Sequence, residues 1–276
     1  MEMELIHIIA LLATGVGVGF ASGLLGIGGC FIMIPVQYWV YLSMGVEPGI
    51  AIKLAFGTNL FVVVPTAISG SLGHHRKGAV WWKAAFVLGV CGLVGAIAGA
   101  TIATHIPGNI LVVVFGAVIL LGGVRMLTAR PPKVEEEPKD SVLLWVLWGL
   151  PLGIVTGFIG IGGGVLMVPV MTLFLKFRIH RAVGTSTAMM ILTSIGGLIG
   201  YIVNGWNVAG IPSPNLGYVH IWSWLALAVT SVGMAQVGAK AAHLLPARQL
   251  KLIFIIVMLY MGLKMIGVFH WLHLPI

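Results

Sequence analysis

Residues 19–35 read GFASGLLGIGGCFIMIP, and residues 153–169 read GIVTGFIGIGGGVLMVP. Each stretch carries a cluster of glycines, and a proline follows at the same place in both, as Pro35 and Pro169. A glycine cluster interrupts an apolar helix readily, because glycine adopts backbone conformations that other residues avoid. The sequence therefore predicts two copies of one unit, each containing a broken helix.

The repeat continues beyond this stretch in the same order. KLAFGTNLFVVVPTAISGSLG at 53–73 aligns with HRAVGTSTAMMILTSIGGLIG at 180–200. We therefore expect a first membrane repeat at 1–128, a polar linker at 129–141 and a second membrane repeat at 142–276. Further aligned pairs are Gly99 and Gly238, Pro107 and Pro246, Phe115 and Phe254, Gly123 and Gly262, and Met126 and Met265.

The composition predicts a membrane protein. Of the 276 residues, 59% are hydrophobic and only 8% are charged, whereas a soluble domain carries about a quarter charged residues. The lipid bilayer is therefore the expected solvent. The formal net charge is +8, but Lys and Arg gather beside apolar runs, which is typical of topology signals and not of nucleic-acid binding. The cysteines and histidines have no metal-ligand spacing, so no metal or other cofactor is expected.

The apolar runs predict an all-α polytopic fold with about five segments in each half. A helix needs about 20 apolar residues to cross the hydrocarbon core, and most runs reach that length. The runs at 31–45 and 164–177 are shorter, and the sequence leaves open whether they cross fully or re-enter. The other runs fall at 5–25, 54–73, 80–104 and 109–127, and at 142–161, 182–203, 219–243 and 249–270.

The basic residues predict that the two repeats have inverted topology. With five segments per half and the N-terminus outside, the loops predicted inside hold most Lys and Arg, while 104–109 and 204–217 outside hold none. With four crossings per half, 74–78 and 176–181 would fall on opposite sides and this bias would be lost. We therefore expect both termini outside. The inside loops are HHRKG (74–78), RMLTARPPK (125–133), KFRIHR (176–181) and ARQLK (247–251).

The glycine clusters at 26–30 and 160–164 are the first candidate binding elements. Inside a membrane a helix end is tolerated only where it lines a cavity or is buried in protein. The half-helix that follows offers free N–H groups and a positive dipole end, which suit an anion. Residues expected at these breaks are Gly28, Gly29, Cys30, Gly162, Gly163 and Gly164. The glycines earlier in each stretch follow a small-xxx-small pattern and predict helix packing instead: Gly19, Gly23, Gly153 and Gly157.

AFGTN at 55–59 and AVGTS at 182–186 are the second candidate. Their hydroxyl and amide groups can donate hydrogen bonds to an oxyanion, although capping of a helix or bonding to the preceding turn is the alternative. The residues concerned are Thr58, Asn59, Thr185 and Ser186. Cations precede each copy and could attract anions at the two mouths, although Arg181 could equally be a topology signal. These cations are Lys53, His180 and Arg181.

The positions of the acidic residues bear on whether a buried carboxylate could bind a driving ion within the membrane. All seven lie near the N-terminus or in expected loops, so coupling through a buried carboxylate is not expected. A cavity without fixed negative charge suits an anionic substrate. Proton coupling through a histidine stays open. The histidines near segment ends are His74, His75, His105, His180, His220, His243, His270 and His273.

Inverted repeats with short, glycine- and proline-interrupted segments are typical of secondary transporters that work by alternating access. No P-loop and no intramembrane protease motif is present, so neither ATP-driven transport nor an enzyme is predicted. The sequence leaves three alternatives open. They are a passive anion channel of the same architecture, a non-transporting membrane sensor or subunit, and a cation carrier.

The doubled G-x-x-G-x-G-G motif with its downstream proline, followed each time by G-T-[NS], resembles the TauE/SafE (sulfite exporter) family of integral membrane proteins. The resemblance covers the whole chain except the linker. It implies a multi-pass protein of the cell inner membrane that exports small sulfur-containing anions, such as sulfite or organosulfonates, without ATP. Cys30 departs from the all-glycine pattern of the second copy, which puts a strictly symmetric site in doubt. The sequence leaves a homodimer open.

Overall fold

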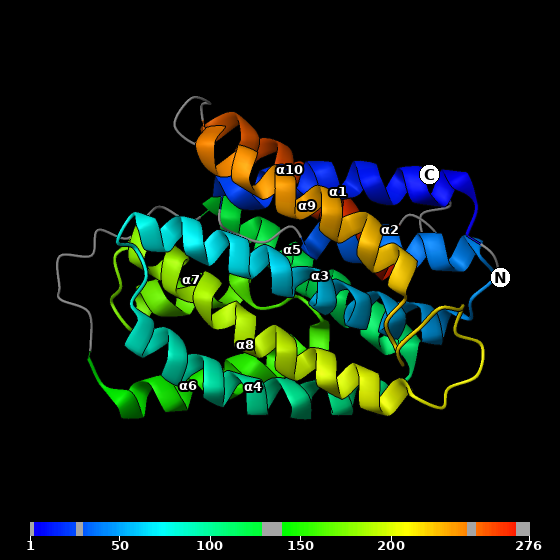
Figure 1. Ribbon diagram of the computed structural model, residues 1–276, viewed down its shortest axis with the longest axis horizontal. Helices are drawn as coiled ribbons and strands as arrows, with labels where there is room; N and C mark the ends of the chain where they lie inside the picture. Colours follow the sequence, from blue (N-terminus) through cyan, green and yellow to red (C-terminus); the bar gives the residue numbers. More distant parts are fainter. Residues whose placement is uncertain (1–2, 26–29, 129–139, 242–246, 269–276) are drawn as a thin grey trace.

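The computed structural model is an all-helical bundle, and it describes residues 3–25, 30–128, 140–241 and 247–268 (Figure 1). Most of the predicted linker therefore lies outside the described residues. Within them the chain forms ten α-helices. They are α1 (Leu5–Leu25), α2 (Cys30–Ser43), α3 (Pro48–Arg76), α4 (Trp82–His105), α5 (Gly108–Thr128), α6 (Val142–Ile159), α7 (Gly164–Leu173), α8 (Ile179–Gly205), α9 (Ile221–Ala241) and α10 (Ala247–Ile266).

The lengths and compositions of these helices agree with a membrane protein. Within the described residues, α3, α4, α5, α6 and α8 are long and apolar enough to cross a bilayer, and α1, α2, α9 and α10 contain shorter apolar stretches. The helix α7 has ten residues, which corresponds to about 15 Å, or half of a hydrocarbon core. The short run predicted at 164–177 therefore forms a half-helix.

Antiparallel helices α3 and α8 lie at the centre of the bundle (Figure 1). Gly57 near the start of α3 faces Tyr201 near the end of α8, and Gly184 near the start of α8 faces His74 at the end of α3. The helices α5 and α10 are also antiparallel, because Gly116 faces Gly262 while the later residue Gly123 faces Met258 and Leu259.

Two parallel pairs complete the bundle, and small residues bring their backbones together. In the α4–α6 pair, Gly153 lies against the backbone of Gly92, and Gly157 lies against the backbone of Ala96. In the α1–α9 pair, Gly19 lies against the backbone of Ser231. A side chain at any of these glycines would collide with a neighbouring main chain. The predicted packing role is thus confirmed for these three, while the surroundings of Gly23 lie outside the described residues.

The helices α6 and α7 form a hairpin whose turn lies inside the bundle. The Trp148 ring of α6 packs on the Phe174 ring that follows α7, with centroids 4.5 Å apart. The arms therefore meet at their open end, and the turn at 160–163 is the opposite tip. The helices α1 and α2 form a similar hairpin, in which the Ser43 Oγ lies 2.9 Å from the His7 Nε2. Because α2 leads into α3 and α7 leads into α8, the two hairpins enter from opposite ends.

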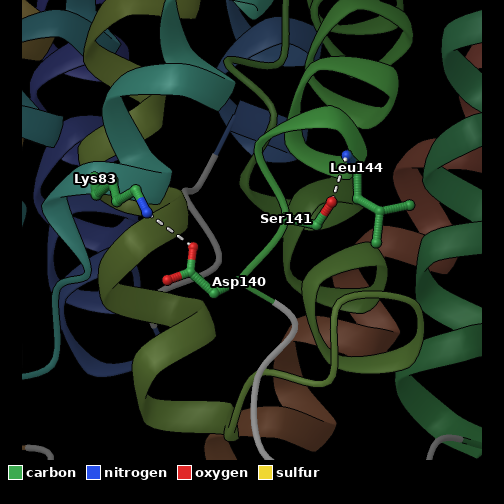
Figure 2. Close-up of polar contacts among 4 residues, drawn as sticks. All are labelled: Lys83, Asp140, Ser141 and Leu144. Atoms are coloured by element: carbon green, nitrogen blue, oxygen red, sulfur yellow. Dashed lines mark hydrogen bonds and ion pairs between the residues drawn. The ribbon is translucent and has the colours of Figure 1, made fainter.

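Two of the loops predicted to be inside lie at the same end of the bundle. Gly184 packs on Ala79 and His74, which brings the α7–α8 connection beside the α3–α4 connection. The start of α6 lies there too, since Lys83 forms an ion pair of 3.0 Å with Asp140 (Figure 2). The next residue, Ser141, accepts a hydrogen bond from the Leu144 N–H and caps α6 (Figure 2). This placement agrees with an odd number of segments per half.

Candidate functional site

The turn between α6 and α7 is built by glycines in a left-handed conformation. The φ angles of Gly160, Gly162 and Gly163 are 67°, 75° and 103°, a region that costs other residues about 1–2 kcal/mol. The turn is also crowded, because a Cβ atom on Gly160 would lie 2.8 Å from the Phe56 Cα atom. The predicted helix break at 162 and 163 is therefore present, whereas Gly164 is already the first residue of α7.

Side chains of α3 and α8 hold the carbonyl groups that this turn exposes. The Asn59 Nδ2 donates a hydrogen bond of 2.7 Å to the Gly160 carbonyl. The Thr193 Oγ1 lies 3.4 Å from the Gly162 carbonyl and 3.3 Å from the Met190 carbonyl of its own helix, so its proton is shared between these acceptors. These contacts satisfy backbone groups that a helix break leaves open inside an apolar bundle.

Three buried polar atoms near this turn have no hydrogen-bond partner among the described residues. They are the Asn59 Oδ1, the Thr156 Oγ1 and the Ser194 Oγ. A Cβ atom on Gly163 would lie 2.8 Å from the Thr156 Oγ1, and one on Gly162 would lie 3.2 Å from the Ser194 Oγ. All three side chains are at most 1% exposed. Because a buried polar group without a partner costs about 1–3 kcal/mol, this grouping indicates a position for a polar ligand.

The electrostatics around the turn favour a negative ligand. The first-turn amides of α7, at Gly164 and Val165, have no acceptor within their own helix and lie at its positive dipole end. The Thr156 and Ser194 hydroxyls can donate hydrogen bonds without losing a proton to the ligand. No Asp or Glu occurs in the sequence after Asp140.

We expect Gly162→Ala to destabilise the protein by more than the left-handed backbone alone explains. Gly45 has a similar φ of 81° but open space around it, so Gly45→Ala should cost only about 1 kcal/mol. At Gly162 the added Cβ would also displace Val63 and Ser194. Thermal unfolding in detergent measures the difference. Equal effects of the two changes would contradict this account of the turn.

Asn59 joins this turn to the start of α2. Its side chain bonds the Gly160 carbonyl and also interacts with the Cys30 thiol, which is buried at the first residue of α2. Cys30 aligns with Gly164, the residue that follows the α6–α7 turn, and Asn59 thus contacts both the first residue of α2 and this turn. Gly28 and Gly29 lie outside the described residues.

Thr58 and Thr185 occupy matching places in the two halves and make the same contact. The Thr58 Oγ1 accepts a 3.0 Å hydrogen bond from the His220 N–H, just before α9. The Thr185 Oγ1 accepts a 3.0 Å bond from the Trp81 N–H, just before α4. Both threonines lie inside long helices and not at their first turns, because Pro48 starts α3 well before Thr58. Each hydroxyl oxygen thus holds the start of a distant helix in place, and the hydroxyl proton remains available to hydrogen-bond another acceptor.

Thr58→Val and Thr185→Val should each lower the free energy of unfolding by about 1–3 kcal/mol, because each leaves a buried backbone N–H without an acceptor. Thr58→Ser and Thr185→Ser retain the hydroxyl and should stay close to the parent protein. Chemical unfolding in detergent measures the loss. Unchanged stability in both valine variants would show that the two hydrogen bonds contribute nothing to the fold.

The remaining predicted residues lie away from the turn or bond locally. The Ser186 Oγ donates to the Val183 carbonyl of its own helix. The Lys53 Nζ donates a 2.7 Å bond to the Thr104 carbonyl near the end of α4, which ties this cation to a helix terminus. His180 is exposed at the start of α8, and the Arg181 guanidinium lies 5.6 Å from the Trp81 ring centroid.

Sequence reasoning missed Thr156 and Ser194. Thr156 aligns with Ser22, so both repeats carry a hydroxyl just before the glycine break, and this shared hydroxyl was the available signal. It was obscured because Thr156 stands between Gly153 and Gly157, whose spacing predicts helix packing. Ser194 aligns with Ala67, so the second repeat carries a hydroxyl where the first carries a methyl group, and no match between the copies marks it.

The comparisons with known proteins agree with these features. The chain matches the family described as Sulfite exporter TauE/SafE over residues 11–265. A probable membrane transporter protein of Methanocaldococcus jannaschii is 30% identical over 268 residues, which cover 96% of this chain and 98% of that protein. One of Haemophilus influenzae is 26% identical over 258 residues, which cover 94% of this chain and 97% of that protein. No solved structure matches the chain.

The apolar helices and the transporter relatives define the class as multi-pass membrane proteins of the transporter type. Within that class, the family match extends over nearly the whole chain. The chain belongs to the sulfite exporter TauE/SafE family.

Proposed function

We propose that the protein is a secondary transporter that exports small sulfur-containing anions, such as sulfite or organosulfonates, by alternating access. One observation carries the proposal: the Thr156 and Ser194 hydroxyls, which are buried and have no hydrogen-bond partner among the described residues, lie beside the glycine turn that starts α7. An oxyanion at this turn would accept hydrogen bonds from these hydroxyls and from the first-turn amides of α7. The family description, Sulfite exporter TauE/SafE, supports the choice of a sulfur oxyanion.

The binding residues of this proposal come from both halves of the chain. The second half supplies Gly162, Gly163, Gly164, Thr185 and Ser186, joined now by Thr156 and Ser194. The first half supplies Gly28, Gly29, Cys30, Thr58 and Asn59. Lys53, His180 and Arg181 would attract anions toward the two mouths. An anion held by neutral donors binds without a fixed countercharge, which lets it leave again as the transporter reopens.

The proposed architecture is a pair of inverted repeats, α1–α5 and α6–α10. Helix contacts support it, because several of them have a counterpart when the two repeats are exchanged. The α1–α9 contact corresponds to the α6–α4 contact, the α3–α9 contact corresponds to the α8–α4 contact, and the α2–α3 contact corresponds to the α7–α8 contact. The pairs α3–α8 and α5–α10 each join a helix to its own counterpart, and both are antiparallel. A twofold axis in the membrane plane requires that arrangement. The equivalent hydrogen bonds of Thr58 and Thr185 support the same axis.

The helix packing also suggests which parts would move. Contacts are extensive within the group α1, α2, α3 and α9 and within the group α4, α6, α7 and α8, and α3 and α8 meet between the groups. Each group thus contains one helix contributed by the opposite repeat. Rocking of one group against the other about the α3–α8 contact would open the site to each side in turn. The proposal places the protein in the cell inner membrane with both termini outside.

Sulfite uptake into proteoliposomes tests the proposal, with sulfate, chloride and a sulfonate as competitors. We expect saturable flux that the sulfonate inhibits and chloride does not, and counterflow driven by unlabelled sulfite. Flux that does not saturate and lacks counterflow would identify a passive channel instead. Flux that follows a sodium or potassium gradient with the opposite charge would identify a cation carrier. No flux of any anion by folded protein would refute the transport proposal.

A further inference from the structure

A second buried polar cluster lies at a different face of α3 from the α6–α7 turn. His220, the residue before α9, is 1% exposed, and its Nδ1 lies 2.8 Å from the Ser223 Oγ. The Tyr41 ring meets the His220 imidazole edge-on, with centroids 5.9 Å apart. The Tyr41 hydroxyl donates to the Thr58 Oγ1 at 3.3 Å and lies 3.4 Å from the Gln37 Oε1. These five buried residues are called the His220 cluster.

The His220 cluster takes Gln37, Tyr41 and Thr58 from the first repeat and His220 and Ser223 from the second. The residues that align with these five are mostly apolar, and only the threonine is retained. The same helix entry is built there, because the Thr185 hydroxyl still accepts the Trp81 N–H. The fold therefore does not require a polar cluster at this place. The counterparts of Gln37, Tyr41, Thr58, His220 and Ser223 are Met171, Leu175, Thr185, Trp81 and Ala84.

Among the described residues, the groups that contact His220 carry no charge. Tyr41 faces it from α2, Thr58 from α3 and Ser223 from α9. The Glu47 carboxylate lies toward Lys53 and Tyr218, and no described contact joins it to His220. A buried imidazolium without a countercharge is unfavourable. His220 is therefore neutral in the empty protein and gains a proton most easily when an anion lies nearby.

The anion site is close enough to supply that negative charge. Thr58 bonds the main chain of His220, and the next residue, Asn59, bonds the Gly160 carbonyl at the α6–α7 turn. Successive residues of a helix point about 100° apart, so the two sites lie on different faces of α3 at nearly the same height, roughly 10 Å from each other. At that distance and an effective dielectric constant near 20, opposite charges favour each other by about tenfold in an equilibrium constant.

We propose that His220 is the proton-binding site of the transporter and that it takes up one proton when the anion binds at the α6–α7 turn. The proton comes from the solvent and bonds to the imidazole Nε2, while Nδ1 stays hydrogen-bonded to Ser223. No other bond changes. Binding of the anion raises the affinity for the proton, and binding of the proton raises the affinity for the anion by the same factor. The anion and the proton then leave together. This inference rests on the proposed anion site.

Binding of methanesulfonate to the purified protein in detergent tests the inference, because a sulfonate stays ionised between pH 3 and 7, and a buried imidazole takes up a proton toward the acidic end of that range. In the parent protein we expect affinity to rise by about tenfold as the pH falls across this range. We also expect uptake of up to one proton per bound anion, recorded with a pH indicator in weakly buffered solution. His220→Asn should bind the anion with an affinity that no longer depends on pH and without proton uptake.

Control variants separate this role from effects on folding. His105→Asn changes an exposed histidine at the end of α4 and should behave like the parent protein. If His220→Asn does not fold, Ser223→Ala retains the imidazole without its hydroxyl partner and should shift the pH at which proton uptake occurs. Parent binding that does not vary with pH, or a pH dependence that His220→Asn retains, overturns the proton site alone. Absence of any sulfonate binding by the folded parent refutes the anion site and the proton site together.

Discussion

Replacing Thr156 by valine and Ser194 by alanine together should reduce sulfite transport by at least about 100-fold and should stabilise the empty protein. Each hydroxyl that bonds an anion contributes about 1.5–3 kcal/mol, so the two losses multiply in affinity. Both oxygens are buried without a described partner in the empty protein. Their removal therefore relieves a desolvation cost of about 1 kcal/mol or more each. Loss of activity combined with a gain in stability is the mark of a binding residue, since a structural residue would lose both.

The measurement is the concentration dependence of sulfite uptake, together with thermal unfolding of the same preparations. Thr172→Val is the matched control, because Thr172 lies in α7 and its hydroxyl already bonds the Val168 and Pro169 carbonyls. That control should leave the KM for sulfite unchanged. If the double variant transports normally, or unfolds at a lower temperature with unchanged KM, the anion does not bind at these hydroxyls.

Gly153→Ala should destabilise the protein by at least about 3 kcal/mol, although it adds only one methyl group. A Cβ atom at this position would collide with the main chain of Gly92, at one of several close contacts between α4 and α6. Main-chain atoms cannot move aside as a flexible side chain can, so the two helices must separate. Close approach of backbones is a main source of helix association in lipid, where the hydrophobic effect between helices is weak.

Gly17→Ala provides the control for this prediction. Gly17 also lies within a helix, α1, but no atom lies within 4 Å of a Cβ atom added there. Alanine is favoured over glycine in a helix by up to about 1 kcal/mol, so Gly17→Ala should leave stability unchanged or raise it. Unfolding by denaturing detergent compares the two variants. A small effect at Gly153 would mean that α4 and α6 adjust their spacing readily.

The sequence by itself determined the segment pattern of this protein. Ten apolar runs and a glycine break ahead of the second short run have counterparts in the described helices. These features are local. A left-handed turn requires glycine whatever surrounds it, and a run of apolar residues forms a helix in lipid because its backbone must bond internally.

Only the tertiary structure decided which side chains meet. Thr58 bonds the main chain of His220, a residue 162 positions away in sequence, and Thr156 of α6 and Ser194 of α8 come to the same turn. The physical reason is that these helices are apolar on every side, so no hydrophobic periodicity marks the face that packs inward. A threonine can face a ligand, a neighbouring main chain or its own helix, and the sequence looks the same in each case. Only the packing of α3, α6 and α8 shows which of these environments a given threonine has.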